Sequence, residues 1–168
     1  MHTAHPDPIL MPVTRFDRER LAVAFGRLGR ESRYQRFLHP KPTISDEELT
    51  YFTDIDHLTH DAIAAVDPTD GSFIGVASYW VLDDRTMSAD LAFFVVDEWQ
   101  GRGVGTTLLR TLLPRAEANG VNSLIALTLQ DNAASRALLR GAGFRSVDAS
   151  YGVVEMRLAL RSPLAVAA

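Results

Sequence analysis

The chain has 168 residues, of which 46% are hydrophobic and 23% charged, and its formal net charge is −4. This length and composition predict one compact domain with its own core. The acidic balance excludes a protein whose main task is to grip the phosphates of nucleic acid. Because the chain has no cysteine, disulfides and thiolate metal sites are excluded as well. The cytoplasm is the expected location.

Both ends of the chain are predicted to be tails. Residues 1–12, the predicted flexible N-terminal tail, hold two histidines and three prolines but neither a basic leader nor an apolar stretch long enough for a signal peptide or a membrane span. Residues 162–168 form a small apolar C-terminal tail. A single domain is therefore predicted for residues 13–161, with no membrane partner.

The first third of the chain is predicted to be helical. Apolar residues recur at helical spacing from residue 17 to residue 28. Ser45 followed by Glu48 is the pattern of a capping box, which predicts the start of a second helical stretch toward Phe52.

Strands are predicted next. Residues 61–66 and 73–81 are strand-like, and residues 67–71 between them contain a proline and an Asp-Gly pair, which are typical of turns. This pattern predicts a hairpin. Leu91–Val96 is a continuous apolar run of strand length, which predicts a strand buried on both faces.

A helix is predicted after the glycine-rich run that follows this strand. Its apolar stripe lies within residues 104–113, Pro114 is expected to distort it, and Asn119-Gly120 closes it. The order of elements predicts an α+β fold with a mixed, mostly antiparallel central sheet flanked by helices. The remaining predicted elements are a strand at 123–129, a helix at 133–140 capped by Asp131 or Asn132, and strands at 144–147 and 152–160.

The glycine-rich run places Gly101, Gly103 and Gly105 where a strand ends and a helix begins. Residues without side chains let backbone N–H groups converge there, and the helix N-terminus adds partial positive charge, so the site suits a pyrophosphate. Arg102 can add a charged contact. The spacing is not the G-x-G-x-x-G of dinucleotide folds, and the Gly-Lys-Ser/Thr of an ATP loop is missing. The alternative interpretation, a glycine-rich turn that serves only tight packing and binds no ligand, is left open.

The stretch from Leu91 to Gly105, with the pattern V-x-x-x-x-Q-G-x-G-x-G, resembles the acyl-CoA-binding core of the GNAT superfamily of N-acetyltransferases. The segment 131–135, followed by Leu138 and Gly143-Phe144, resembles that family's second cofactor segment. The resemblance implies the family's fold over roughly residues 13–160. It also implies acetyl transfer from acetyl-CoA to an amine by direct attack in a ternary complex, without a metal.

The resemblance also implies a set of cofactor contacts. The main chain of Phe94, Val95 and Val96 would hold the pantetheine arm and the thioester carbonyl, and backbone donors there would stabilise the oxyanion. Asn132 would bond the pantetheine arm, serve as a plain helix cap, or do both. The pyrophosphate loop would consist of Gln100, Gly101, Arg102, Gly103, Val104, Gly105 and Thr106.

Direct transfer needs a neutral amine, so a group must accept a proton. Asp90 is the first candidate base, because it shares the side-chain parity of the central strand's Phe94, and Glu98 is the second. Many family members protonate the leaving thiolate with a tyrosine at the position of Leu139, so this acid is missing. Tyr151 is a possible substitute, although an exposed or core tyrosine is the simpler interpretation.

The acceptor is left open between a protein lysine and a small amine. Residues 31–37 and the segment His60-Asp61-Ala62 resemble GNAT domains of bacterial protein-lysine acetyltransferases, which favours a lysine. Two further alternatives are a non-catalytic acyl-CoA sensor and a domain whose loop only packs. His57 and His60 suggest a metal, but a capped turn is favoured because further ligands are missing. A homodimer is also left open.

Overall fold

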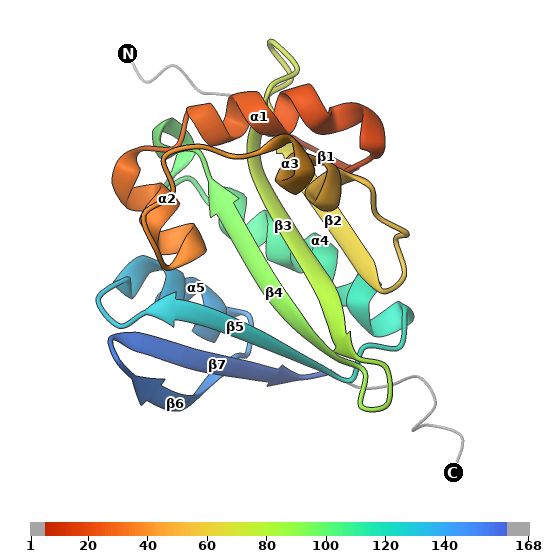
Figure 1. The fold of residues 1–168 in the computed structure, drawn as a ribbon, viewed down its shortest axis with the longest axis vertical. Coiled ribbons are helices and arrows are strands. Elements are labelled where there is room, and N and C mark those ends of the chain that lie inside the picture. Colours follow the sequence, from red (N-terminus) through yellow and green to blue (C-terminus); the bar gives the residue numbers. More distant parts are fainter. Residues whose placement is uncertain (1–5, 161–168) are drawn as a thin grey trace.

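A seven-stranded sheet forms the centre of the computed structural model, which describes residues 6–160 (Figure 1). Its strand order is β1-β2-β3-β4-β5-β7-β6, and only the β4–β5 pair is parallel. The predicted mixed, mostly antiparallel sheet is therefore confirmed. The strands are β1 (Ile9–Pro12), β2 (His60–Val66), β3 (Phe73–Asp83), β4 (Ser88–Val95), β5 (Ser123–Leu129), β6 (Arg145–Ser150) and β7 (Val153–Ala159).

Helices cover both faces of the sheet. In Figure 1, α1 to α3 lie over the upper part of the front face, whereas α4 and α5 lie behind it. None of the helices within residues 6–160 has the length and apolar character that crossing a membrane requires. The helices are η1 (Arg15–Asp17), α1 (Arg18–Gly26), α2 (Arg30–Phe37), α3 (Asp46–Thr53), η2 (Asp97–Trp99), α4 (Val104–Ala118) and α5 (Ala133–Gly141).

Two capping boxes fix the helical first third. The predicted one is confirmed: the Glu48 N–H donates to the Ser45 hydroxyl, and the Ser45 N–H donates to the Glu48 carboxylate at 2.8 Å. A second one, with Thr14 and Asp17, starts η1. Such reciprocal bonds satisfy N–H groups that a helix leaves without partners.

The predicted N-terminal tail is wrong for its last four residues. Ile9–Pro12 form strand β1, which pairs with residues 63–66 of β2. Four residues are too few for a clear alternation of polar and apolar side chains, so the strand depends on the edge that β2 offers. Residues 1–5 and 161–168, which include the predicted C-terminal tail, lie outside the described residues.

The sheet divides where β4 meets β5. The two strands pair only between residues 88–90 and 123–125, and then diverge. β5 instead pairs along all of its residues with β7. This explains why the prediction of a strand buried on both faces is wrong: Ala92, Phe93, Phe94 and Val95 are only half-buried, because no strand follows their free edge. The divergence leaves room for a site.

Candidate functional site

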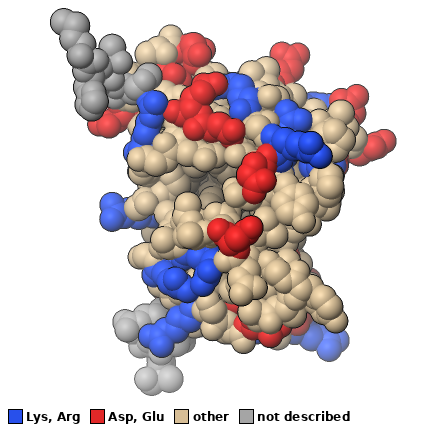
Figure 2. Space-filling model, turned by 90° about the vertical axis from the view of Figure 1, so that its left-hand side faces the viewer, with Lys and Arg blue, Asp and Glu red and all other residues tan. Residues whose placement is uncertain are grey.

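A cavity of about 300 Å³ occupies the gap between the diverging strands. Its walls come from α2, the second half of β4, the loop and first turn of α4, the middle of β5 and the start of α5. Figure 2 shows the face that includes α2 and α5 in space-filling form: it is hollowed, and charges of both signs lie around the hollow. The volume is at the lower end of the range for ligand pockets.

The free edge of β4 offers backbone donors to this cavity. The Val96 N–H donates to the Ile74 carbonyl on β3 at 2.9 Å. Because the two sides of an antiparallel strand alternate, the N–H groups of Phe93 and Val95 point the other way, toward the gap. The Val95 carbonyl also points away from β3, since the Gln100 amide donates to it at 3.0 Å. By this register, two N–H groups that have no acceptor among residues 6–160 face the cavity.

This geometry refines the predicted pantetheine contacts. Phe94 and Val95 line the cavity as expected, but Val96 is buried and its N–H bonds β3. Phe93, which was not among the predicted pantetheine contacts, also lines the cavity. Only the register between β3 and β4 tells which N–H groups are free, and the sequence does not contain that register.

The loop before α4 gathers further backbone donors. Gly101 and Gly103 have φ angles of 71° and 81°, a left-handed conformation that glycine adopts without strain. A Cβ atom at either position would meet nothing within 4 Å, so the backbone conformation, not space, requires glycine. The N–H groups of the first helical turn have no intrahelical acceptors. These groups belong to Val104, Gly105 and Thr106, which line the cavity.

Gly105 has a different role from the other two glycines. A Cβ atom there would lie 2.8 Å from Cδ2 of Leu138 on α5, so this glycine lets the two helices approach each other. Arg102 does not line the cavity, and its guanidinium lies 5.3 Å from the centre of the Trp99 ring. The phosphate contact of Arg102 stays a prediction, and it would need the guanidinium to leave the Trp99 ring.

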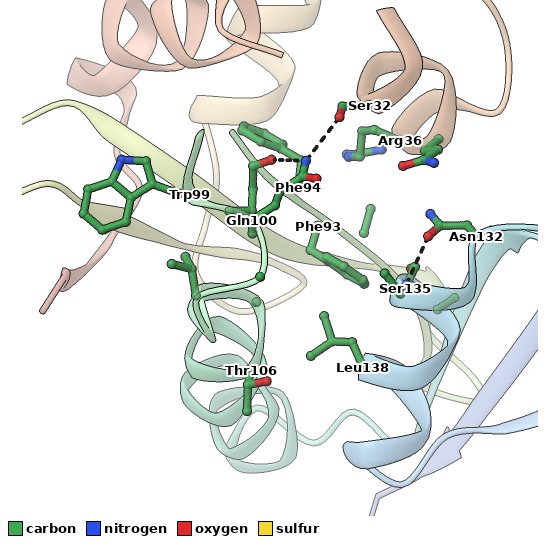
Figure 3. A pocket seen from close by; sticks show the side chains of 18 of the residues that line it. Ser32, Arg36, Phe93, Phe94, Trp99, Gln100, Thr106, Asn132, Ser135 and Leu138 are labelled. Carbon is green, nitrogen blue, oxygen red and sulfur yellow. Dashed lines mark hydrogen bonds between the residues drawn. The ribbon is translucent and has the colours of Figure 1, made fainter. Parts of the chain in front are cut away.

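Gln100 connects the end of β4 to α2. Its amide donates to the Ser32 hydroxyl at 3.1 Å as well as to the Val95 carbonyl (Figure 3). The side chain lines the cavity but turns toward α2, not toward the glycine loop. It positions the cavity wall, and the pyrophosphate contact that the resemblance implied stays a prediction.

Asn132 caps α5 and also faces the cavity (Figure 3). Its Oδ1 accepts the Ser135 N–H at 3.1 Å, which confirms the cap. Its amide nitrogen makes no hydrogen bond within residues 6–160, so a donor remains available to a ligand. The cap and a ligand contact are therefore compatible.

The two candidate bases have different surroundings. Asp90 is half-buried at the last residue of β4 that pairs with β5, and its carboxylate has no partner within residues 6–160. Burial, and second the charge of Glu155, raise its pKa. It does not line the cavity itself, but the next residue, Leu91, does. Glu98 is exposed and pairs with Arg27 at 2.7 Å outside the cavity, so the structure favours Asp90 over Glu98, and the choice of base stays a prediction.

The position at which relatives carry a tyrosine is closed to the cavity. Leu139 is 1% exposed and belongs to the core, whereas its neighbour Leu138 lines the cavity. Tyr151 is fully exposed in the turn between β6 and β7 and does not line the cavity. No tyrosine among residues 6–160 lines the cavity, so the thiolate has no phenol to protonate it there.

The two histidines lie in a capped turn, as favoured. The Asp56 carboxylate accepts the N–H groups of residues 58–60. The His57 ring contacts the buried Asp61 carboxylate, and the Arg115 guanidinium forms an ion pair with the same carboxylate at 2.7 Å. The His60 ring contacts Tyr51 in a tilted arrangement and Trp80 edge to face. Within the described range, no three His, Asp or Glu side chains form a group that could hold a metal.

The comparisons with known proteins agree with this geometry. Residues 9–145 match the family described as the acetyltransferase (GNAT) domain. The chain is 32% identical to acetyltransferase Pat of Mycolicibacterium smegmatis over 146 residues, which are 86% of this chain and 43% of that relative. It is 30% identical to acetyltransferase PA5475 of Pseudomonas aeruginosa over 157 residues, or 90% of this chain and 83% of the relative.

A solved structure supports the same assignment. The GNAT domain of S. lividans PAT superposes with a TM-score of 0.85 at 28% sequence identity, covering 91% of this chain and 90% of that one. The chain spans less than half the length of Pat from M. smegmatis, so what that longer protein does as a whole is a separate matter. The sequence motifs, the diverging strands and the family match lead to one conclusion: the chain belongs to the GNAT acetyltransferase family.

Proposed function

We propose that this protein transfers an acetyl group from acetyl-CoA to a primary amine by direct attack in a ternary complex. The observation that carries the proposal is the set of unpaired donors along one cavity. The N–H groups of Phe93 and Val95 face one part of it, and the free N–H groups of the first turn of α4 face another. A pantetheine thioester with a pyrophosphate at its far end has matching acceptors.

Each part of acetyl-CoA then has a matching group on the protein. The pyrophosphate binds at the N-terminus of α4, where the helix dipole favours negative charge. The pantetheine arm lies between β4 and β5, with the Asn132 amide within reach of the cavity. The thioester oxygen accepts hydrogen bonds from the free N–H groups of β4. These bonds strengthen as negative charge develops on that oxygen.

Asp90 accepts a proton from the ammonium form of the acceptor through a bridging water, which leaves a neutral amine to attack the thioester. Its raised pKa keeps it a usable base while its carboxylate has no competing partner. A water is required because Asp90 lies one residue before the cavity wall at Leu91. When the tetrahedral intermediate collapses, the departing thiolate takes a proton from the amine nitrogen or from solvent, because Leu139 is buried and Tyr151 is remote.

A protein lysine is the acceptor that we favour. The resemblance of residues 31–37 to protein-lysine acetyltransferase domains supports it. So does the face of the sheet beside Asp90, where Trp80 and Ile125 pair with it across the strands and Glu155 lies close enough to raise its pKa. The apolar neighbours suit the aliphatic stem of lysine, and the Asp90 carboxylate suits its ammonium, whereas Glu155 is paired with Arg157 at 2.6 Å. A small primary amine is the second candidate, and a cytoplasmic location fits both.

Calorimetric titration with acetyl-CoA, followed by a thiol-release assay with lysine peptides and small amines, tests the proposal. We expect binding, and CoA release with one class of acceptor. Binding without turnover for any acceptor would identify a non-catalytic acyl-CoA sensor. Absence of binding at millimolar acetyl-CoA in a folded sample would overturn the proposed function.

A further inference from the structure

Arg36 of α2 lies between two cavities. Its side chain lines the cofactor cavity and also a second cavity beneath α1, α2 and α3. Ala92 and Phe94 of β4 line both cavities as well, so the two spaces meet at these three residues. Figure 3 shows Arg36 near Asn132 and far from Thr106, at the end opposite the pyrophosphate loop.

The guanidinium of Arg36 has no anionic partner. It makes no hydrogen bond or ion pair within residues 6–160, and its Nε is buried without a partner. Its contacts are stacking contacts, 4.8 Å from the Phe37 ring centre and 5.9 Å from that of Phe52. Burial lowers its pKa to about 10, so it remains charged at neutral pH.

Neighbouring arginines differ in this respect. Arg33, on the same helix, also has a buried Nε without a partner, but its terminal N–H groups donate to the carbonyls of Pro42 and Gly26, and Arg27 pairs with Glu98. The Arg36 side chain is half-buried, and a charge that is partly withdrawn from water is normally paired because an unpaired one is costly. An unpaired guanidinium at the wall of a reaction cavity therefore indicates a partner that arrives with a substrate.

The second cavity limits the size of that partner. Its volume is about 30 Å³, and its lining is mainly apolar, with Ser78 as the polar residue besides Arg36. A cavity of this size holds on the order of two water-sized groups. Ser78 is 7% exposed, and its hydroxyl makes no hydrogen bond within the described residues. A carboxylate is small enough and offers acceptors to both side chains.

We propose that Arg36 is a specificity-determining residue that binds a carboxylate of one of the two reactants inside the acyl-transfer cavity. The inference rests on the proposed function, because it assumes that acyl-CoA occupies the first cavity. A guanidinium binds a carboxylate through two parallel charge-assisted bonds. The carboxylate can come from a dicarboxylic acyl chain, which enters past Ala92 and Phe94, or from an acceptor that carries a carboxylate near its amine.

The first arm of the test addresses the acyl donor. Binding of succinyl-CoA and of butyryl-CoA, which have equal numbers of carbons in their acyl chains, is measured by calorimetry for the wild type, Arg36→Met and Arg36→Lys. If the acyl chain is the source, the wild type prefers succinyl-CoA by about 10- to 100-fold, the range expected for hydrogen bonds to a charged group. Arg36→Met loses the preference, and Arg36→Lys keeps part of it.

The second arm addresses the acceptor. With acetyl-CoA saturating, initial rates are compared for a panel of amino acids, each matched with its decarboxylated amine, such as L-lysine and cadaverine. If the acceptor is the source, the amino acid has the lower KM, and Arg36→Met removes that difference. Arg30→Met is the matched control, because Arg30 is exposed on the same helix and does not line either cavity.

The outcomes separate this inference from the proposed function. A carboxylate preference in either arm that Arg36→Met removes and Arg30→Met keeps supports the inference and names the reactant. No carboxylate preference in either arm, or one that survives Arg36→Met, overturns it while acetyl-CoA binding stands. If Arg36→Met does not fold, the wild-type preference and Arg36→Lys still decide. Failure of the wild type to bind acetyl-CoA overturns the proposed function instead.

Discussion

The two sides of the cavity are built in different ways. On the side of the glycine loop, the available groups are backbone N–H groups of the first turn of α4, held by Gly101 and Gly103 in left-handed conformations. On the side of α2, the available group is the Arg36 side chain, and the Asp90 carboxylate lies just beyond the β4 wall; neither has a hydrogen-bond or ion-pair partner within residues 6–160, and the free N–H groups of β4 lie between the two sides. Backbone groups suit a ligand part that never varies, and side chains suit one that differs between relatives.

The comparison predicts what substitutions do. A change on the loop side acts through backbone conformation and affects binding of every acyl-CoA alike. A change on the other side acts through one charge and affects turnover or selectivity. The comparison would fail if a change in the loop altered selectivity alone, or if a change of Arg36 or Asp90 weakened the binding of every acyl-CoA.

Asp90→Asn should have the largest effect. Removing the proposed base lowers kcat by about 10²- to 10⁴-fold, the range typical of general base catalysis, while acetyl-CoA binding is unchanged. Thiol release measured with a fixed amine tests this, with Glu98→Gln as the control that retains activity, since Glu98 pairs with Arg27 outside the cavity. Equal losses in both variants would argue against Asp90 as the base.

The pH dependence sharpens the same assignment. A base works when deprotonated, so activity rises with pH through the raised pKa of Asp90. Because the negative charge of Glu155 helps to raise that pKa, Glu155→Gln lowers it, and the acidic limb of the pH–kcat profile moves to lower pH. An unchanged acidic limb in Glu155→Gln, with wild-type folding, would contradict the assignment.

Gly103→Val should weaken acetyl-CoA binding by about 10- to 100-fold. A β-branched residue is strained at a φ of 81°, so the loop changes conformation and its N–H groups no longer converge. Gly103→Asn is the matched control, because asparagine tolerates this conformation and a Cβ atom meets nothing within 4 Å. Calorimetry with both variants tests the claim, and equal losses would show that space matters instead of conformation.

Leu139→Tyr should not restore the acid that many relatives use. Leu139 is 1% exposed in the core, so the larger ring costs about 1–3 kcal/mol of unfolding free energy by overpacking. The phenol stays outside the cavity, and the turnover of the folded fraction does not increase. Chemical denaturation and single-turnover kinetics test the two parts. A gain in turnover would show that position 139 reaches the thioester.

Ser32→Ala should have the smallest effect. It removes one of the acceptors of the Gln100 amide, which keeps its bond to the Val95 carbonyl. A neutral hydrogen bond contributes about 0.5–1.5 kcal/mol, so the KM for acetyl-CoA rises a few-fold at most and kcat is unchanged. Steady-state kinetics with a fixed acceptor measures this, and Ser135→Ala is a suitable control, because only its backbone N–H bonds Asn132.

The sequence predicted the glycine loop before a helix and the Asn132 cap, but not the groups on the other side of the site, for physical reasons. Glycine spacing and a strand-to-helix boundary are local, so the loop and the Asn132 cap could be read from neighbouring residues. The free N–H groups of Phe93 and Val95 depend on the register with β3, and Arg36 reaches the cavity only through the packing of α2. Strand β1 was missed because its partner β2 lies about fifty residues downstream.

The short β4–β5 pairing gives the sheet two blocks, β1 to β4 and β5 to β7, joined at one end by three residue pairs. An extended ligand arm bonded to both strand edges would act as a substitute strand that closes the seam. Hydrogen exchange should then show the β5–β7 block opening independently in the free protein and together with the other block once acetyl-CoA is bound. Binding of acetyl-CoA would then couple the unfolding of the two blocks of the sheet.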